Sequence, residues 1–474
     1  MTLSSVWQDG RPRTDPAEPG EVAGRYDVAV VGAGLTGLTT ALLLGRSGQS
    51  VVVLEAGRVG AGTTARSTAK FSLLQGTQLS TIRSRHPQVI VDAYVEAQRE
   101  GAAWVRRFCE EHDVALQDRD AVTYANTGSG ERSLREELDA SERAGLPVEW
   151  VDELPLPYPV RGALRLPEQF QLDPVELLDA LVQQAVAHGV RIVEGARVLK
   201  VRGSDPVRIS TETGQVEAGR VVVATNLPIL DRGGFFARMK PARSYSVAFR
   251  TQQQVVDAMY LSADEPSRSL RDAPAERGHL LLVGGNGHTT GRGGSTQKRL
   301  EVLRAWTHEH WPDAEETHAW SAQDYVPHHA LPFAGPILPG ADEILVGGGY
   351  SKWGMTNAVA VSLALTARIL GTPPEWSEVL RTYAPTELRG LPTAARDNAE
   401  VGLEMTRGWV GALAGRSLRR DRGNGELTRV CTHLGGVVRW NDAERSWDCP
   451  LHGSRFDETG AVLDGPAVKA LPGG

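Results

Sequence analysis

The stretch from Tyr26 to Ala56 constrains the fold of this chain more than any other. It reads YDVAVVGAGLTGLTTALLLGRSGQSVVVLEA, in which two short apolar runs flank a glycine turn and an apolar segment of helical length. The order of strand, glycine turn, helix and strand predicts a βαβ unit with a GxGxxG fingerprint. We therefore expect an α/β, Rossmann-like domain that binds a dinucleotide; an ordinary α/β turn without a ligand is the alternative.

The residues of this turn have separate physical tasks. Gly32 permits the sharp turn, Gly34 lets backbone approach a pyrophosphate, and Gly37 lets the helix pack closely on the strand. The free N–H groups at the helix amino terminus favour phosphates. Glu55 ends the second strand, where it is suited to accept hydrogen bonds from ribose hydroxyls. The nucleotide contacts predicted here are Gly32, Ala33, Gly34, Thr36, Gly37, Glu55 and Ala56.

Length and charge narrow the function classes. A chain of 474 residues is long enough for two or three domains. Its net charge of −7 and its lack of a basic run argue against a nucleic-acid partner. The first 24 residues are polar without a signal-peptide core. No apolar run reaches the roughly 18 residues that a membrane span needs. A cytoplasmic location is therefore expected.

A run of small and hydroxylated residues, 57–70, follows the acidic residue. Such a loop can wrap a cofactor, with Ser67 and Thr68 as hydroxyl donors, or can be a plain surface loop. Its place directly after the dinucleotide unit favours the cofactor. Further along, a charged helical pattern carries Cys109, which we expect to be a packed core residue.

Later segments return to the nucleotide sheet. Asp173 and Pro174 have the order of a helix cap and first helical residue, and an apolar strand ends at Ala224 and Thr225. Residues 240–320 alternate between strand patterns and one helix, which predicts an α+β layer. Then a strand, a GGGYSKWGMTN turn and a helix starting near Thr356 offer another free helix amino terminus.

These three units together resemble the FAD-dependent amine and amino-acid oxidoreductases of the D-amino-acid oxidase and glycine oxidase superfamily, over residues 26 to about 385. The resemblance implies FAD, and implies noncovalent binding because the GTTARSTAK loop holds no His and residues 320–365 hold no Cys. It places the adenine edge near Val198 and the isoalloxazine against the last turn. The additional cofactor contacts expected are Val198, Ala224, Thr225, Gly354, Met355 and Thr356.

The carboxyl-terminal segment carries a second redox motif. Cys431-Thr-His433 is followed, after fifteen residues, by Cys449-Pro-Leu-His452-Gly-Ser-Arg-Phe. This pattern resembles the CxH and CxxH pairs of Rieske proteins, in which two thiolates hold one iron of a [2Fe–2S] cluster and two imidazoles the other. A zinc site is the alternative. The extra cysteines that high-potential Rieske proteins join by a disulfide are replaced here by Gly436 and Leu451.

The resemblances imply an FAD-dependent dehydrogenase that removes hydride from a carbon beside an amine nitrogen and passes electrons to the cluster, with a redox partner or O2 as acceptor. A flavin takes two electrons and the cluster one at a time, so the fusion suits a two-to-one electron splitter. Three alternatives remain open: an electron-transfer protein serving a partner enzyme, a redox sensor, and a biosynthetic desaturase.

The substrate pocket is expected where the chain should face the flavin. No general base is assigned, because hydride loss from a neutral amine needs mainly orientation and desolvation. Lys352 adds positive charge that favours flavin reduction. Trp353 could equally be a core residue, and for the histidines a packed or solvated loop position is favoured over the pocket. The candidates are Tyr245, Asp324, Tyr325, His328, His329, Lys352 and Trp353.

The expected organisation is discontinuous. A small all-β Rieske domain should follow an α/β FAD-binding domain with an α+β cap, joined by a polar, Pro-containing linker that permits domain motion or exchange between subunits. The predicted divisions are a tail at 1–24, an FAD domain at 25–80, 166–240 and 331–385, a cap at 81–165 and 241–330, a linker at 386–412, and the Rieske domain at 413–474.

Overall fold

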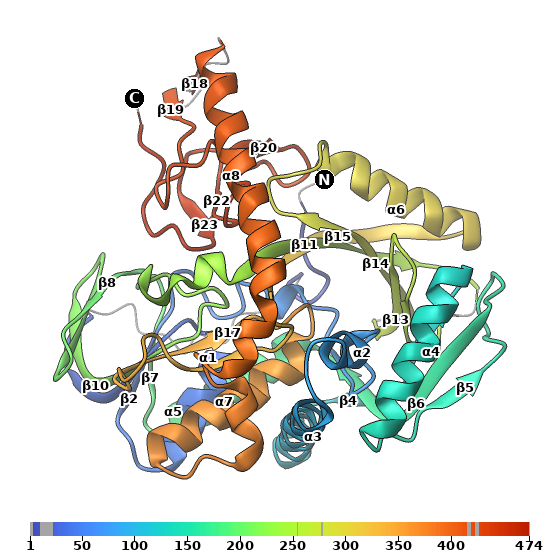
Figure 1. Cartoon of the computed structure of the whole chain (residues 1–474), viewed down its shortest axis with the longest axis horizontal. Helices are drawn as coiled ribbons and strands as arrows, with labels where there is room; N and C mark the ends of the chain where they lie inside the picture. Colours follow the sequence, from blue (N-terminus) through green and yellow to red (C-terminus); the bar gives the residue numbers. More distant parts are fainter. Residues whose placement is uncertain are drawn as a thin grey trace.

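The fold is described from a computed structural model, which covers residues 3–9, 22–253, 255–275, 278–414, 419–421 and 426–473. Two large sheets lie side by side, and a small four-stranded sheet sits above them in Figure 1. We call the described residues between 22 and 385 the flavin part, and residues 426–473 the Rieske part. The α/β and α+β fold class predicted from the sequence, with a small all-β domain, is confirmed.

The first sheet has the order β16-β17-β10-β1-β2-β7, with β8 and β9 attached beside β10. The valine-rich strands β1, β2 and β10 pair in parallel and are buried by layers on both faces. This is the expected composition of a parallel sheet. The strands are β1 Arg25–Val31, β2 Val51–Leu54, β7 Arg191–Val193, β8 Val198–Arg202, β9 Val207–Thr211, β10 Gln215–Val223, β16 Phe333–Pro336 and β17 Ile344–Gly348.

Helices α1, α5 and α7 pack together on this sheet, and α3 packs on α7. Asp173 caps α5 by accepting from the N–H of Val175 at 2.8 Å, with Pro174 as the first helical residue, as predicted. The helices of this layer are α1 Leu35–Arg46, α3 Gln88–Glu111, α5 Pro174–Ala187 and α7 Gly354–Leu370; the short 3-10 turns are η1 Thr64–Arg66, η2 Arg232–Ala237, η3 Glu375–Leu380 and η4 Pro385–Gly390.

The second sheet has the order β15-β11-β14-β13-β12-β4-β6-β3, and β5 pairs with β6. Its strands come from three separate chain segments. Their long antiparallel ladders form the cap of the flavin part. Its elements are β3 Lys70–Phe71, α2 Gln78–Arg83, β4 Leu116–Ala125, α4 Gly128–Arg143, β5 Glu149–Val151, β6 Gly162–Leu172, β11 Met239–Arg250, β12 Met259–Ser262, β13 Arg268–Pro274, β14 His279–Thr289, α6 Thr296–His310 and β15 Glu315–Pro327.

The segment expected to be a linker is a long helix, α8 (Leu391–Leu413). It rises from the flavin part and runs beside the Rieske part (Figure 1). Asn398 donates to the carbonyl of Ala237 at 2.8 Å, and Trp409 donates to that of Gly435 at 3.1 Å, so the helix contacts both parts. The elements that follow are β18 Arg419–Asp421, β19 Glu426–Thr428, β20 Arg439–Asn441, β21 Ser446–Asp448, β22 Arg455–Phe456 and β23 Val462–Asp464.

The start of the chain packs on the flavin part. Trp7 is buried, and its indole N–H donates to the carbonyl of Ser67 at 2.8 Å. Residues 10–21 of the predicted polar tail lie outside the described residues. Among the described helices, none combines the length and apolar character needed to cross a membrane.

Candidate functional site

The glycine turn between β1 and α1 has the tight geometry that its sequence predicts. Gly32 adopts φ 103°, in the left-handed region that favours glycine. A Cβ on Gly37 would lie 1.9 Å from the carbonyl oxygen of Gly32, so only glycine fits there. The N-cap residue of α1 is Gly34, which has no side chain to cap the helix, and the Thr64 hydroxyl accepts from the N–H of Leu35 at 3.2 Å. The amino-terminal end of this helix lines a cavity and is suited to an anionic ligand.

Glu55 stands at the end of β2, across the turn from α1. Its carboxylate accepts from the backbone N–H of Ala33 and of Gly57, each at 2.8 Å. Burial raises the pKa of Glu55, because a charged carboxylate is poorly solvated there. The two backbone donors hold its oxygens at the rim where a ribose would bind.

A cavity of about 1170 Å³ opens in front of this turn. It exceeds the range of about 300–1,000 Å³ that is usual for small-molecule pockets, so a dinucleotide and a small substrate both have room. Most of the predicted cofactor and substrate contacts line it. They are Gly32, Ala33, Gly34, Thr36, Glu55, Ala56, Ser67, Thr68, Val198, Ala224, Thr225, Tyr245, Asp324, Lys352, Trp353, Gly354 and Met355.

Other predicted residues lie behind the cavity wall. Thr356 is buried and accepts from the side-chain amide of Gln75 at 2.9 Å. His328 lies 3.5 Å from Asp397 of α8, and burial lowers its pKa. The carbonyl of His329 bonds the His86 ring at 2.7 Å. Gly37, Tyr325, His328, His329 and Thr356 are thus not among the described lining residues.

Asp324 and Lys352 meet where the cap joins the last glycine turn. The Asp324 carboxylate accepts from the backbone N–H of Lys352 and from the Asn226 amide, the latter at 2.9 Å. Lys352 itself adopts φ 70°, which is strained for a side chain of this size. Burial raises the pKa of Asp324 and lowers that of Lys352. Lys352 therefore has a poorly solvated ammonium group and lines the cavity.

Lys70 also lines the cavity, and it was not among the predicted site residues. Its ammonium group donates to the carbonyl of Tyr260 at 2.8 Å and to the hydroxyl of Ser269 at 2.7 Å. Burial lowers its pKa well below the ordinary value. In the sequence Lys70 only ends a hydroxyl-rich loop, and its partners are almost 200 residues away. Nothing local indicated that it would reach the cavity.

The four predicted cluster ligands lie in the Rieske part as two pairs, one of thiols and one of imidazoles. Cys431 and Cys449 are buried, and the hydrogen bond from the Cys449 thiol lowers the pKa of Cys431 to about 7. The rings of His433 and His452 have centroids 5.2 Å apart. The buried Nδ1 of His452 has no hydrogen-bond partner. An unpartnered buried nitrogen is costly without a ligand, so these donors fit a metal group.

The second histidine supports the same assignment. His433 bonds Asp231 through Nε2 at 2.6 Å, which leaves its Nδ1 for iron. Among the described residues no three or more His, Cys, Asp and Glu side chains converge as for a single metal ion. A [2Fe–2S] cluster would need two ligands for each iron, and Cys431 with Cys449 and His433 with His452 would supply them. Gly436 and Leu451, which stand at the positions of the extra cysteines, lie side by side. A Cβ on Gly436 would be 2.6 Å from the side chain of Leu451.

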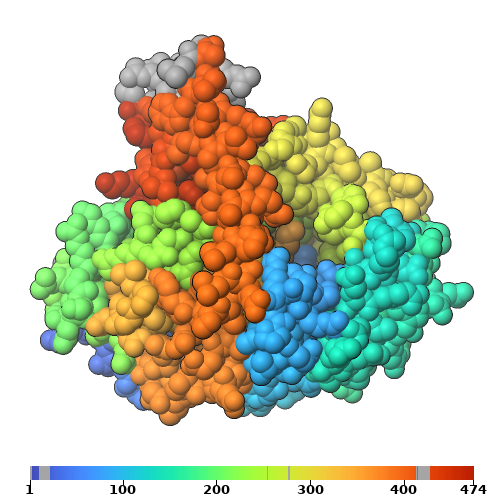
Figure 2. Space-filling model, in the orientation of Figure 1, coloured from blue at the N-terminus to red at the C-terminus, as the bar shows by residue number. Residues whose placement is uncertain are grey.

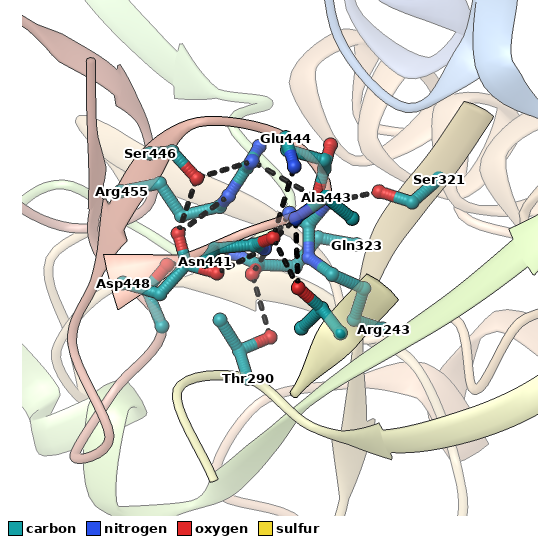
Figure 3. A network of polar contacts seen from close by, with 12 residues as sticks. Arg243, Thr290, Ser321, Gln323, Asn441, Ala443, Glu444, Ser446, Asp448 and Arg455 are labelled. Carbon is teal, nitrogen blue, oxygen red and sulfur yellow. Dashed lines mark hydrogen bonds and ion pairs between the residues drawn. The ribbon is translucent and has the colours of Figure 1, made fainter. Parts of the chain in front are cut away.

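A buried polar network joins the Rieske part to the cap (Figure 3). Arg243 of β11 is 1% exposed and pairs with Glu444 at 2.7 Å. Arg455 pairs with Glu444 at 3.1 Å and with Asp448 at 3.1 Å. Burial opposes the charge on Glu444, but the two arginines outweigh it and lower its pKa to about 2. The Rieske part is therefore fixed on its own chain. Figure 2 shows it seated on the flavin part.

Arg243→Ala is expected to reduce the free energy of unfolding by about 2–3 kcal/mol, because a buried carboxylate loses one of its two cations. Thermal and urea unfolding of the holoprotein measure this. Arg165→Ala is the matched control, since Arg165 pairs with Glu149 at the surface with side chains 45% and 58% exposed. That pair is worth about 0–1 kcal/mol. Equal losses in the two variants would contradict the role of the buried network.

The same network predicts that the stability of the fold depends on pH in the acid range. The pKa of Glu444 is about 2 in the folded protein and 4.5 ordinarily, so its charge stabilises the fold above pH 4.5. That contribution is expected to fall as the pH drops from 4.5 towards 2. Unfolding measured across this range should therefore show a smaller pH slope in Glu444→Gln than in the wild type. Identical slopes would contradict the assignment.

Comparison with known proteins gives two family matches. Residues 27–368 match the family described as FAD dependent oxidoreductase, and residues 422–473 match the Rieske [2Fe-2S] domain. The protein YhfW of Bacillus subtilis, whose name describes a Rieske 2Fe-2S iron-sulfur protein, is 31% identical over 94% of this chain and 92% of its own. The cytochrome b6-f complex iron-sulfur subunit 1 of a Nostoc species is 58% identical over 45 residues, 10% of this chain and 25% of its own.

Solved structures show the same fold. Glycine oxidase from Geobacillus kaustophilus aligns with a TM-score of 0.61 at 20% identity, covering 74% of this chain and 96% of its own. L-proline dehydrogenase from P. horikoshii aligns with a TM-score of 0.63 at 16% identity, covering 75% and 96%. At these identities the likeness concerns the fold alone.

Proposed function

The chain belongs to the family of FAD dependent oxidoreductases and carries a Rieske [2Fe–2S] domain, and from this premise we propose that it oxidises a C–N bond of a small amine or amino acid. Bound FAD supplies a hydride acceptor at N5, and the cluster supplies a one-electron carrier. Solved structures of similar fold include a glycine oxidase and an L-proline dehydrogenase, which supports this substrate class.

One observation carries the proposal: a single cavity is lined by the glycine turn, the cap sheet and the Rieske part. Glu444, Arg455 and Asp464 of the Rieske part are among its lining residues. A substrate bound there would lie between the FAD site and the domain that holds the cluster. This arrangement supports electron passage from flavin to cluster rather than two independent functions.

The cap side of the cavity is suited to an amino acid. Lys70 uses two N–H bonds on Tyr260 and Ser269, which leaves one ammonium hydrogen for a carboxylate. Lys352 supplies a second cation, and the hydroxyls of Ser244 and Ser246 line the same wall. Burial lowers the pKa of both lysines, so an anionic group that enters would restore their charge. These residues would orient the substrate and exclude water.

Lys352→Met is expected to slow substrate-driven bleaching of the flavin at least about tenfold, because a preorganised cation at the reacting centre is lost. Anaerobic stopped-flow absorbance measures the rate. Lys298→Met removes the same charge from an exposed position of α6 and is the matched control. A Lys352→Met rate equal to that of the control would exclude Lys352 from the chemistry.

The function itself is tested by anaerobic titration of the holoprotein with a panel of small amines and amino acids. We expect one class to bleach the flavin and then produce a Rieske EPR signal. If dithionite produces both signals and no amine affects the flavin, the chain is an electron-transfer protein or acts on another substrate class. The panel therefore separates the proposal from its main alternatives.

A further inference from the structure

We propose that the histidine edge of the Rieske cluster site is docked inside its own chain, against Asp231, Phe236 and Tyr325, and is closed to external redox proteins. Only the consequence for electron transfer rests on the proposed function, because the docking itself can be tested without any substrate. The sequence did not predict this docking, because the segment before the Rieske part was expected to be a polar linker.

The first contact is an aromatic cover over both ligand histidines. The ring of Phe236 has its centroid 5.4 Å from that of His433 and 5.0 Å from that of His452. The side chain of His433 is 4% exposed, and His452 is 5% exposed. Phe236 belongs to η2, which follows the cavity-lining residues Ala224 and Thr225 in the chain. The flavin part therefore covers the edge that an external protein would have to contact.

The second contact is polar and involves the outer nitrogen of a ligand. Nε2 of His433 bonds the Asp231 carboxylate at 2.6 Å. Asp231 is itself largely exposed, with 61% of its side chain accessible, so it covers the ring from the solvent side. The bond holds His433 by Nε2, which leaves Nδ1 as the nitrogen that would bind iron. Nε2 is the nitrogen that a partner protein would otherwise approach.

The third contact joins the second ligand loop to β15. The hydroxyl of Tyr325 donates to the carbonyl of His452 at 3.3 Å, and the amide of Gln323 donates to that of Gly453 at 2.8 Å. A Cβ on Gly453 would lie 2.7 Å from Pro241, so this loop presses directly on β11. Asp324, between the two donors, lines the cavity. One strand thus contacts the ligand loop and the cavity.

Separate anchors hold the Rieske part in this position. Asp442 accepts from the N–H of Thr296 at 2.8 Å, at the start of α6. Arg292 donates to the carbonyl of Pro450 at 2.8 Å. The buried Arg243–Glu444 pair (Figure 3) is a further anchor between the same two parts. Undocking would break all of them together, so the histidine edge stays covered. A one-electron acceptor protein must then reach the cluster from another face or take electrons from the flavin.

The test is carbethoxylation of the oxidised holoprotein by diethyl pyrocarbonate, followed by mass spectrometry of the His433 and His452 peptides. Exposed His188 in the same sample is the internal reference. We expect both ligands to react at least about tenfold more slowly than His188, because reaction requires local opening. Wild-type ligands protected less than tenfold would overturn the proposal.

Two variants test which side chains shield the His433 ring. Phe236→Ala and Asp231→Ala are expected to raise the reactivity of His433 at least about tenfold, since each removes a contact over the ring. Asp342→Ala, at an exposed ion pair with Arg368, is the control and should leave it unchanged. Iron content and the EPR signal show that each variant keeps its cluster. If both variants stay as protected as the wild type, the assignment of the cover is overturned. Neither readout depends on substrate, so failure here is distinct from failure of the proposed function.

Discussion

Gly37→Ala is expected to lower the FAD content of the purified protein at least about tenfold. The new Cβ would lie 1.9 Å from the carbonyl oxygen of Gly32 and 3.0 Å from its carbon. Backbone cannot yield as a flexible side chain can, and overpacking of this kind costs about 1–3 kcal/mol or more. The turn that must yield is the one predicted to hold the dinucleotide phosphates. Absorbance of the desalted protein at flavin wavelengths measures the loss.

A matched control separates loss of the site from a general effect of alanine in a helix. Gly402 lies in α8, and a Cβ there meets nothing within 4 Å. Gly402→Ala should keep its FAD and gain up to about 1 kcal/mol from helix propensity. Far-ultraviolet circular dichroism shows whether Gly37→Ala still folds. A folded Gly37→Ala protein with wild-type FAD content would mean that the cofactor does not bind at this turn.

Cys449→Ser is expected to abolish the Rieske EPR signal while the flavin spectrum is retained. Cys449 and Cys431 are the two buried thiols that meet beside the histidine rings, and one iron needs both. A hydroxyl is a poor replacement for a thiolate at iron, so iron content should fall from two atoms per chain to about none. EPR of the dithionite-reduced protein and an iron assay provide the measurement.

The chain offers its own control for this change. Cys109 is also buried, but it packs in the helical core of the flavin part, and burial raises its pKa to about 12. Cys109→Ser should therefore keep both cofactors and lose only packing energy. A normal Rieske signal in Cys449→Ser would contradict the ligand assignment. Loss of the signal in both variants would point to general instability of the protein.

Local patterns predicted the two cofactors, FAD and a Rieske [2Fe–2S] cluster. The glycine turn with Glu55 and the CxH and CxxH pairs are short motifs whose chemistry requires particular residues at particular spacings. They identified the FAD dependent oxidoreductase family, the Rieske domain and the α/β fold, and the comparisons confirm all three. Residues expected at the cofactor, such as Gly34 and Met355, line the cavity because they belong to continuous strand-turn-helix units.

The substrate side was less predictable, because it is assembled from segments far apart in the chain. Lys70 reaches Tyr260 across 190 residues, and no local pattern records such a contact. His328 was a pocket candidate for which packing was the favoured alternative, and it packs beside Asp397 of α8. In a cap of antiparallel strands, register and twist decide which alternate side chain faces the cavity.

The sequence by itself determined which cofactors the chain can hold, since glycine turns and paired ligands are encoded within short segments. Only the tertiary structure decided how the two redox sites are arranged. A segment predicted as a polar linker is the helix α8, and the histidine edge of the cluster site lies on Phe236 and Asp231. Such docking depends on complementary surfaces from distant segments, whose fit arises only once each part has folded.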